Sequence, residues 1–117
     1  MCSSVAAVGR DKDVYERPND PPALILLSLA GGAKHGHALA KDIAGFAGVT
    51  LSPGALYGAI TRLEARGLIE PLREEDRRRP YRLTAKGRRA LAAIVDEMRT
   101  LADVGSTRLG LSWGTAR

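Results

Sequence analysis

Residues 52–67, which read SPGALYGAITRLEARG, decide the fold. Ser52 suits the N-cap of a helix because its side-chain oxygen can accept a hydrogen bond from a first-turn N–H. Pro53 suits the first helical position, since it has no N–H to leave unpaired and its φ is already helical. Gly67 can adopt the left-handed conformation that ends many helices. The stretch therefore predicts one short helix with both ends specified.

The two faces of this predicted helix differ in kind. Leu56, Ile60 and Leu63 recur at helical spacing and form an apolar stripe. The opposite face is small, polar and weakly basic, with Tyr57 on its flank. Its members are Gly54, Gly58, Thr61, Arg62 and Ala65. Each glycine costs a helix about 1 kcal/mol against Ala, so something other than helix stability explains them. Small exposed groups let a partner come close, and a DNA major groove is one candidate.

Two further helices are expected before this stretch. Residues 22–30 are apolar nearly all round, which is typical of a buried helix, and the Gly31-Gly32 pair ends it. Residues 35–46 carry an apolar stripe at helical spacing. A tight turn joins this second helix to the one that follows Ser52, so the pair is predicted to form a helix-turn-helix.

A hairpin and a long helix are expected after it. Residues 68–72 and 80–83 read as short strands around a charged turn, and Pro71 restricts the first strand to a sheet edge. Thr84 can cap a final helix over about residues 85–104. The order predicts a winged helix-turn-helix with one extra helix, a mainly α fold with a small β-hairpin.

The chain divides into four predicted parts. Residues 1–20 are polar and unpatterned, and we expect a flexible N-terminal arm. Residues 21–84 form the winged helix-turn-helix, and residues 85–104 form a dimerisation helix. Residues 105–117 are rich in Gly, Ser and Thr, which favours a flexible tail with a lone Trp113.

Composition excludes several classes of protein. A length of 117 residues is that of one domain, and 44% hydrophobic residues is ordinary for a soluble globular chain. We find no apolar run of about 18 residues, so we expect no membrane span. We find no signal-peptide pattern at the N-terminus, and the lone Cys2 fits a reducing cytoplasm.

The charge is localised. The formal net charge is +5, and residues 62–89 carry all of it, because they hold 10 basic and 5 acidic side chains while the remainder is balanced. Such a segment is typical of a protein that binds the phosphate backbone of nucleic acid. A solvated, charged hairpin explains the charge equally well.

The densest basic point is Arg77-Arg78-Arg79, in the predicted turn. We favour contact between these side chains and DNA phosphates or a minor groove, because a helix-turn-helix is predicted beside them. The alternative is that they form surface pairs with the neighbouring acidic residues Glu74, Glu75 and Asp76.

Candidate catalytic and metal sites are weak. His35 and His37 lie two residues apart, and such side chains do not face each other on a helix, so we expect no metal site. The sequence contains no nucleophile elbow, phosphate loop or Cys pair. We therefore expect neither an enzyme nor a bound cofactor.

The final helix carries apolar residues at mixed spacings of 3 and 4, as in a helical packing seam. The predicted seam consists of Leu91, Ile94, Val95, Met98 and Leu101. We favour a seam with a second copy of the chain. The alternative is a helix that only covers its own domain.

Four segments between residues 22 and 98 resemble the PadR-like transcriptional regulators. They read KHGHAL (34–39), LSPGALY (51–57), RLEARGLI (62–69) and RPYRLTAKG (79–87). Two positions depart from the family's pattern, because His37 stands where the family usually has Tyr and Gly58 where it usually has Pro. The short tail resembles the branch with one C-terminal helix.

The resemblance implies a homodimeric winged-helix repressor, with a small aromatic or drug-like effector as a further expected partner. Drug-binding members use aromatic residues at the dimer centre, and residues 85–104 contain none. The expected contacts with double-stranded DNA are Lys34, His35, Ser52, Gly54, Tyr57, Thr61, Arg62, Arg77, Arg78, Arg79 and Tyr81. The main alternative is a winged-helix protein-interaction module that does not bind DNA.

Overall fold

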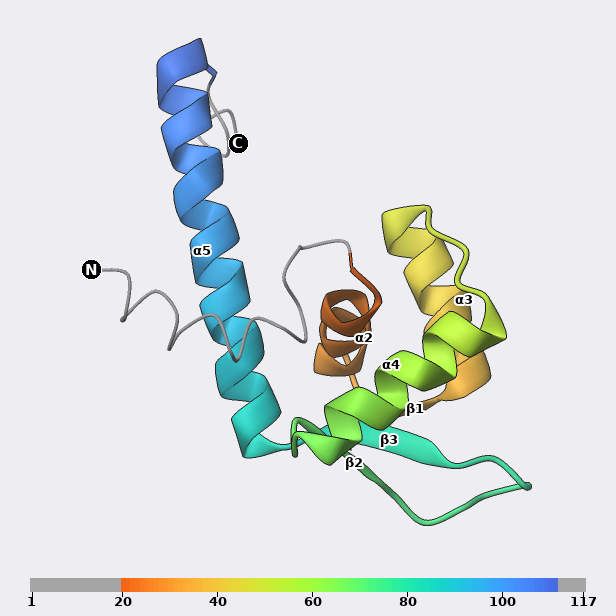
Figure 1. Ribbon diagram of the computed structural model, residues 1–117. Helices are drawn as coiled ribbons and strands as arrows, with labels where there is room; N and C mark the ends of the chain where they lie inside the picture. The colour runs from red at the N-terminus through yellow and green to blue at the C-terminus, as the bar shows by residue number, and fades with distance from the viewer. Residues whose placement is uncertain (1–19, 112–117) are drawn as a thin grey trace.

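The computed structural model describes residues 20–111 of the 117-residue chain. Its helices are α2 (Pro21–Ala30), α3 (Gly36–Ala47), α4 (Pro53–Ala65) and α5 (Ala85–Leu109). Its strands are β1 (Lys34–His35), β2 (Ile69–Pro71) and β3 (Pro80–Leu83). A mainly helical fold with a small antiparallel sheet confirms the predicted fold class (Figure 1). The predicted arm, apart from Asp20, and Trp113 lie outside the described residues.

Helix α2 is the centre of the core. It packs against α3, α4, α5 and β3. Ile25, Leu26 and Leu29 are fully buried, as expected for a helix that is apolar nearly all round. Within residues 20–111, no helix is both long enough and apolar enough to cross a membrane.

Helices α3 and α4 form the predicted helix-turn-helix. Gly48 ends α3 in the left-handed conformation, with φ of 67°. The Ser52 side chain accepts a hydrogen bond from the Ala55 N–H at 3.1 Å, which confirms the predicted cap of α4. Leu56, Ile60 and Leu63 are at most 3% exposed, so the apolar stripe of α4 faces the core and its opposite face is outward.

The sheet has three strands in the order β1-β3-β2. Strand β2 lies at an edge, as Pro71 predicted. Strand β1 was not predicted, because two residues are too few to show an alternating pattern. It pairs Lys34 with Tyr81 and His35 with Pro80, so the start of α3 is connected directly to β3. Strands β2 and β3 and the turn between them form the wing.

The junction between β3 and α5 explains the segment RPYRLTAKG. Thr84 Oγ1 accepts a hydrogen bond from the Gly87 N–H at 3.0 Å and donates one to the Gly67 carbonyl at 2.6 Å. A Cβ at Gly87 would overlap the Leu68 carbonyl oxygen. Thr84 therefore fixes where α5 starts, and Gly87 lets the helix approach the loop after α4.

Helix α5 is longer than predicted. The predicted end at Val104 is wrong, because the helix continues to Leu109 and includes residues assigned to the tail. Gly105 does not end it, since one glycine costs a helix only about 1 kcal/mol against Ala. Gly110 does, with φ of 75° and the Leu111 N–H donating to the Ser106 carbonyl at 2.8 Å.

The predicted seam on α5 divides into two parts. Leu91 and Ile94 are 7% and 6% exposed and belong to the core of their own chain, with Met98 packed beside them. The expectation that they lie between protomers therefore does not hold for Leu91 and Ile94. Leu101 is 65% exposed. The C-terminal part of α5 projects away from the other labelled elements (Figure 1).

Candidate nucleic-acid interface

The outer face of α4 is open. Nothing lies within 4 Å of a Cβ built at Gly54, and at Gly58 the nearest atom is Arg62 Nη1 at 3.8 Å. The fold therefore has room for a side chain at both positions, and packing among residues 20–111 does not explain these glycines. Thr61 and Arg62 are exposed beside them. Thr61 Oγ1 donates to the Tyr57 carbonyl at 2.9 Å, so its oxygen keeps a lone pair for a partner.

Tyr57 lies at the edge of this face and reaches the start of α3. Its side chain is 50% exposed. A Cβ at Gly36 would overlap the Tyr57 hydroxyl, so Gly36 makes room for the phenol ring. This contact joins two of the segments that resemble the PadR-like regulators, and it fixes Tyr57 against α3 at the beginning of the exposed face.

The tip of the wing is a two-residue turn. Glu75 and Arg78 exchange two backbone hydrogen bonds, each of 2.8 Å. Asp76 and Arg77 between them have φ of 51° and 65°, as a type I′ turn requires. Positive φ is unfavourable for Arg, which lacks the local hydrogen bonding that helps Asn and Asp there. Arg77 is therefore held at the tip in a strained backbone conformation.

The three wing arginines differ in their partners. Arg79 donates to the Leu72 carbonyl at 2.8 Å and lies 3.9 Å from Glu74. Arg77 and Arg78 form no ion pair with another residue in the described range. The alternative of surface pairing therefore applies to Arg79 alone, and the other two guanidiniums are exposed without an acidic partner.

A cavity of about 210 Å³ lies between three elements, and most of the residues that line it are predicted DNA contacts. His35 and His37 come from the start of α3, and Tyr57 comes from α4. The wing supplies Arg77, Arg78, Arg79 and Tyr81. Burial raises the pKa of the Tyr81 phenol above its ordinary value, and the Glu64 carboxylate adds to the rise. Tyr81 therefore stays a neutral hydroxyl at physiological pH and can donate a hydrogen bond.

His37 was missing from the predicted contacts. His35 is the N-cap of α3 with an extended backbone, so the rule that helical side chains two apart diverge does not apply. The two rings stack with centroids 6.4 Å apart and planes 15° apart. The only signal in the sequence was the position of His37, where related proteins usually have Tyr.

Between residues 20 and 111, no three His, Cys, Asp or Glu side chains gather as they would around a metal ion.

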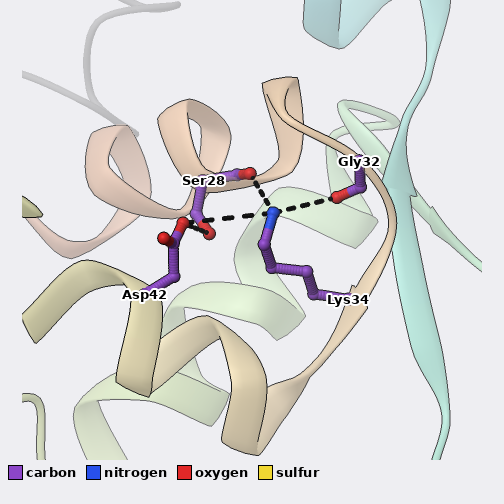
Figure 2. A network of polar contacts seen from close by, with 4 residues as sticks. All are labelled: Ser28, Gly32, Lys34 and Asp42. Carbon is purple, nitrogen blue, oxygen red and sulfur yellow. Dashed lines mark hydrogen bonds and ion pairs between the residues drawn. The ribbon is translucent and has the colours of Figure 1, made fainter. Parts of the chain in front are cut away.

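Lys34 has a structural position (Figure 2). Its ammonium donates to the carbonyls of Ser28 at 2.6 Å and Gly32 at 3.2 Å, and it lies 4.0 Å from Asp42. Ser28 in turn donates to Asp42 at 2.6 Å. The Lys34 side chain is only 22% exposed. We therefore assign Lys34 to holding the turn between α2 and α3 rather than to contact with DNA.

The fold and this basic site define the class of winged-helix transcriptional regulators. Residues 25–93 match the model of the family described as "Transcriptional regulator PadR-like family". The chain belongs to the PadR-like family, a family of transcriptional regulators rather than enzymes.

Two solved structures similar to the chain agree with this assignment. A transcriptional regulator from Clostridium thermocellum is 28% identical, with 81% of this chain and 93% of that chain covered and a TM-score of 0.65. A PadR family transcription regulator from Clostridium difficile R20291 is 26% identical, with coverage of 80% and 99% and a TM-score of 0.66. An uncharacterized 37.1 kDa protein in transposon TN4556 of Streptomyces fradiae is 45% identical over 85 residues. That match covers 73% of this chain and only 25% of the Streptomyces protein.

Proposed function

We propose that the chain binds duplex DNA as a homodimer and represses transcription. The observation that carries this proposal is the wing, where Arg77 and Arg78 are exposed without acidic partners beside the open face of α4. In a winged helix-turn-helix, the second helix of the motif enters the major groove, and side groups next to it contact the backbone. Family membership supports the same role.

The exposed face of α4 would read the base edges. Arg62 can bond bidentately to guanine, and Thr61 can contact either a polar edge or a thymine methyl. Gly54 and Gly58 would let the helix backbone approach the floor of the groove, since no described part of the chain occupies their side-chain positions. Ser52 and Tyr57 would lie at the end of the helix that is nearest to α3.

The projecting half of α5 would form the dimer. One face of α5 follows alternating spacings of 3 and 4 residues, at Leu91, Ile94, Met98, Leu101 and Gly105. The chain's own core covers the first half of this seam, while Leu101 is 65% exposed and Leu109 is 75% exposed. A second copy of α5 would bury these side chains.

We propose that a small-molecule effector releases the repressor. A hollow of about 330 Å³ lies where Ala30, Leu83 and Val95 meet, and Arg88, Asp96 and Arg99 surround it. Its apolar floor and charged rim suit a small amphipathic molecule. A ligand there would contact α5, so it could change the distance between the two copies of α4 in a dimer.

Salt dependence of DNA binding tests the proposed function. Each contact between a cation and a phosphate contributes about 0.9 to the slope of log affinity against log salt, and a dimer makes each contact twice. Replacing Arg77, Arg78 and Arg79 with Gln should make the slope shallower by roughly 2 to 5 units. Affinity for random DNA should fall about as much as affinity for the operator.

Titrations of both proteins at four salt concentrations provide the measurement. The alternative, in which the arginines form surface pairs with neighbouring acidic residues, predicts an unchanged slope and a stability change below about 1 kcal/mol. A wild-type protein without measurable affinity for duplex DNA at low salt would favour the protein-interaction module instead.

A further inference from the structure

Two hydrogen-bond donors face each other between the wing and the start of α3. His35 Nε2 lies 3.3 Å from Arg78 Nη1. On the other side of the same ring, His35 Nδ1 accepts a hydrogen bond from the Ala38 N–H at 3.3 Å, and this bond caps α3. The two contacts place conflicting requirements on one imidazole ring.

The cap of α3 decides between the two contacts, because the Ala38 N–H is fixed by the helix backbone whereas the Arg78 side chain is exposed. A backbone N–H can only donate, so Nδ1 carries no proton when it caps α3. A neutral imidazole then has its single proton on Nε2. Arg78 is also only a donor, because its guanidinium stays charged. The contact between Nε2 and Nη1 is therefore a meeting of two N–H groups and not a hydrogen bond.

Two converging donors can share one acceptor, and no described residue is placed to supply it. They open onto a hollow of about 370 Å³ that Glu75, Asp76 and Pro80 also line. Neither carboxylate lies within 4.0 Å of the Arg78 guanidinium. A short turn with positive φ at Asp76 and Arg77 holds the wing in this position.

The geometry points to a phosphate clamp, in which one phosphate oxygen accepts hydrogen bonds from both His35 Nε2–H and Arg78. This inference rests on the proposed function, because the phosphate is a phosphodiester of the bound DNA backbone. Inorganic phosphate has the same oxygen chemistry and is the alternative source. The clamp gives His35 two simultaneous roles, since one ring nitrogen caps α3 while the other holds the backbone of the ligand.

The two donors should leave different signatures in DNA binding. Arg78 brings a charge, so Arg78→Gln should make the salt slope shallower by about 1.8 units in a dimer. His35 brings a neutral donor, so its loss should leave the slope unchanged. His35→Asn separates its two roles, because Asn is a good N-cap residue but is too short to reach the phosphate.

The experiment measures affinities of wild type, His35→Asn, Arg78→Gln and the double variant for one duplex at several salt concentrations. We expect His35→Asn to weaken binding about three- to tenfold at every salt concentration, on operator and random DNA alike. Because both donors bind one oxygen, the effects of the two substitutions should not multiply. The fold loss of affinity in the double variant should be at least about threefold smaller than the product of the two single fold losses. Arg89→Gln, on the exposed surface near the start of α5, removes the same charge and should preserve the wild-type affinity to within about twofold.

Multiplicative losses in the double variant would overturn the clamp while leaving DNA binding intact. A shallower salt slope for His35→Asn would also overturn it, because the ring would then act as a cation. Circular dichroism of His35→Asn is the control for the cap and should match the wild-type helix signal.

Nitrogen-detected NMR of the free protein tests the tautomer directly. The clamp predicts a His35 ring with the proton on Nε2 and a bare Nδ1, and an Nε2 resonance that shifts when duplex DNA is added. A proton on Nδ1 would overturn it. A shift in about tenfold excess of sodium phosphate, together with no affinity for duplex DNA, would assign the clamp to free phosphate and reject the proposed function.

Discussion

At the scale of single residues, the glycines fall into two kinds. At Gly36 and Gly87 the side-chain space is already occupied, by the Tyr57 phenol at the first and by the Leu68 backbone carbonyl at the second, so Gly87 is required by the fold. Gly54 and Gly58 have free space around them, although they weaken the helix that carries them. We infer that the space in front of α4 is kept open for a partner.

Gly58→Ala should therefore change stability and DNA affinity in opposite directions. Removing the backbone freedom of Gly in a helix should raise the free energy of unfolding by about 0.5–1 kcal/mol. The added methyl group should crowd the groove at a cost of about 1–3 kcal/mol, so affinity should fall about five- to hundredfold. Urea unfolding and fluorescence anisotropy with a labelled operator provide the two measurements.

Gly45→Ala is the matched control. Gly45 is an exposed helical glycine in α3, and nothing lies within 4 Å of its Cβ position. It should gain similar stability without loss of DNA affinity. If Gly58→Ala binds the operator as tightly as wild type, α4 does not approach the groove through this face.

Residue patterns predicted some of this detail and missed the rest. The caps Ser52 and Thr84 were predictable because each precedes a clear helix start and acts within its own turn. The position of Lys34 was not, because its partners come from the end of α2 and from α3, and a sequence does not show which side chains meet there. The cap formed by His35 was missed because His is an uncommon N-cap residue.

At the scale of elements, the wing shows what a hairpin sequence reveals and conceals. Strand β3 has the predicted bounds, and Pro71 placed β2 correctly at an edge. The turn was predicted only as charged. Its strained geometry was not evident, because a type I′ turn usually has Asn-Gly or Asp-Gly, whereas this chain has Asp76-Arg77. Likewise, the sequence suggested that Gly105 ends the last helix, whereas Gly110 ends it in the structure.

Two substitutions of Arg77 separate strain from charge. Arg77→Gly relieves the positive φ and should raise the free energy of unfolding by about 1 kcal/mol. Arg77→Gln keeps the strain, so its stability should stay within about 0.5 kcal/mol of wild type. Both remove one cation and should reduce the salt slope of DNA binding by about 1.8 units in a dimer. Unequal slopes for the two variants would show that turn shape, not charge, controls binding.

At the scale of the whole molecule, α5 both completes the fold and carries the proposed dimer contact. Leu91 and Ile94 on its apolar seam complete the core of their own chain, while Leu101 and Leu109 are exposed farther along and would form the proposed contact. The periodicity predicted the seam from the sequence. The periodicity does not show which residues of the seam belong to the core, because that depends on how far α2 and β3 extend beside α5.

Changing Leu101 and Leu109 together to Glu should separate the protomers without unfolding them, because both side chains are exposed within one chain. Buried unpaired charges in a dimer seam cost several kcal/mol. Sedimentation at micromolar concentration should show a monomer with the wild-type helix content. Glu at Thr100 and Thr107, on the other side of α5, is the control and should stay dimeric. A Leu101/Leu109 variant that remains dimeric would place the interface elsewhere.

Selection of bound duplexes from a random library tests the central proposal most directly, because it reports DNA binding and symmetry together. A homodimer that reads the major groove with two copies of α4 predicts an inverted repeat, with half-site centres separated by about one helical turn, 10–10.5 base pairs, or a multiple of it. The same selection with Arg62→Ala should lose the preference at one position in each half-site. Enrichment of no sequence, or of a single site without two-fold symmetry, would contradict the account.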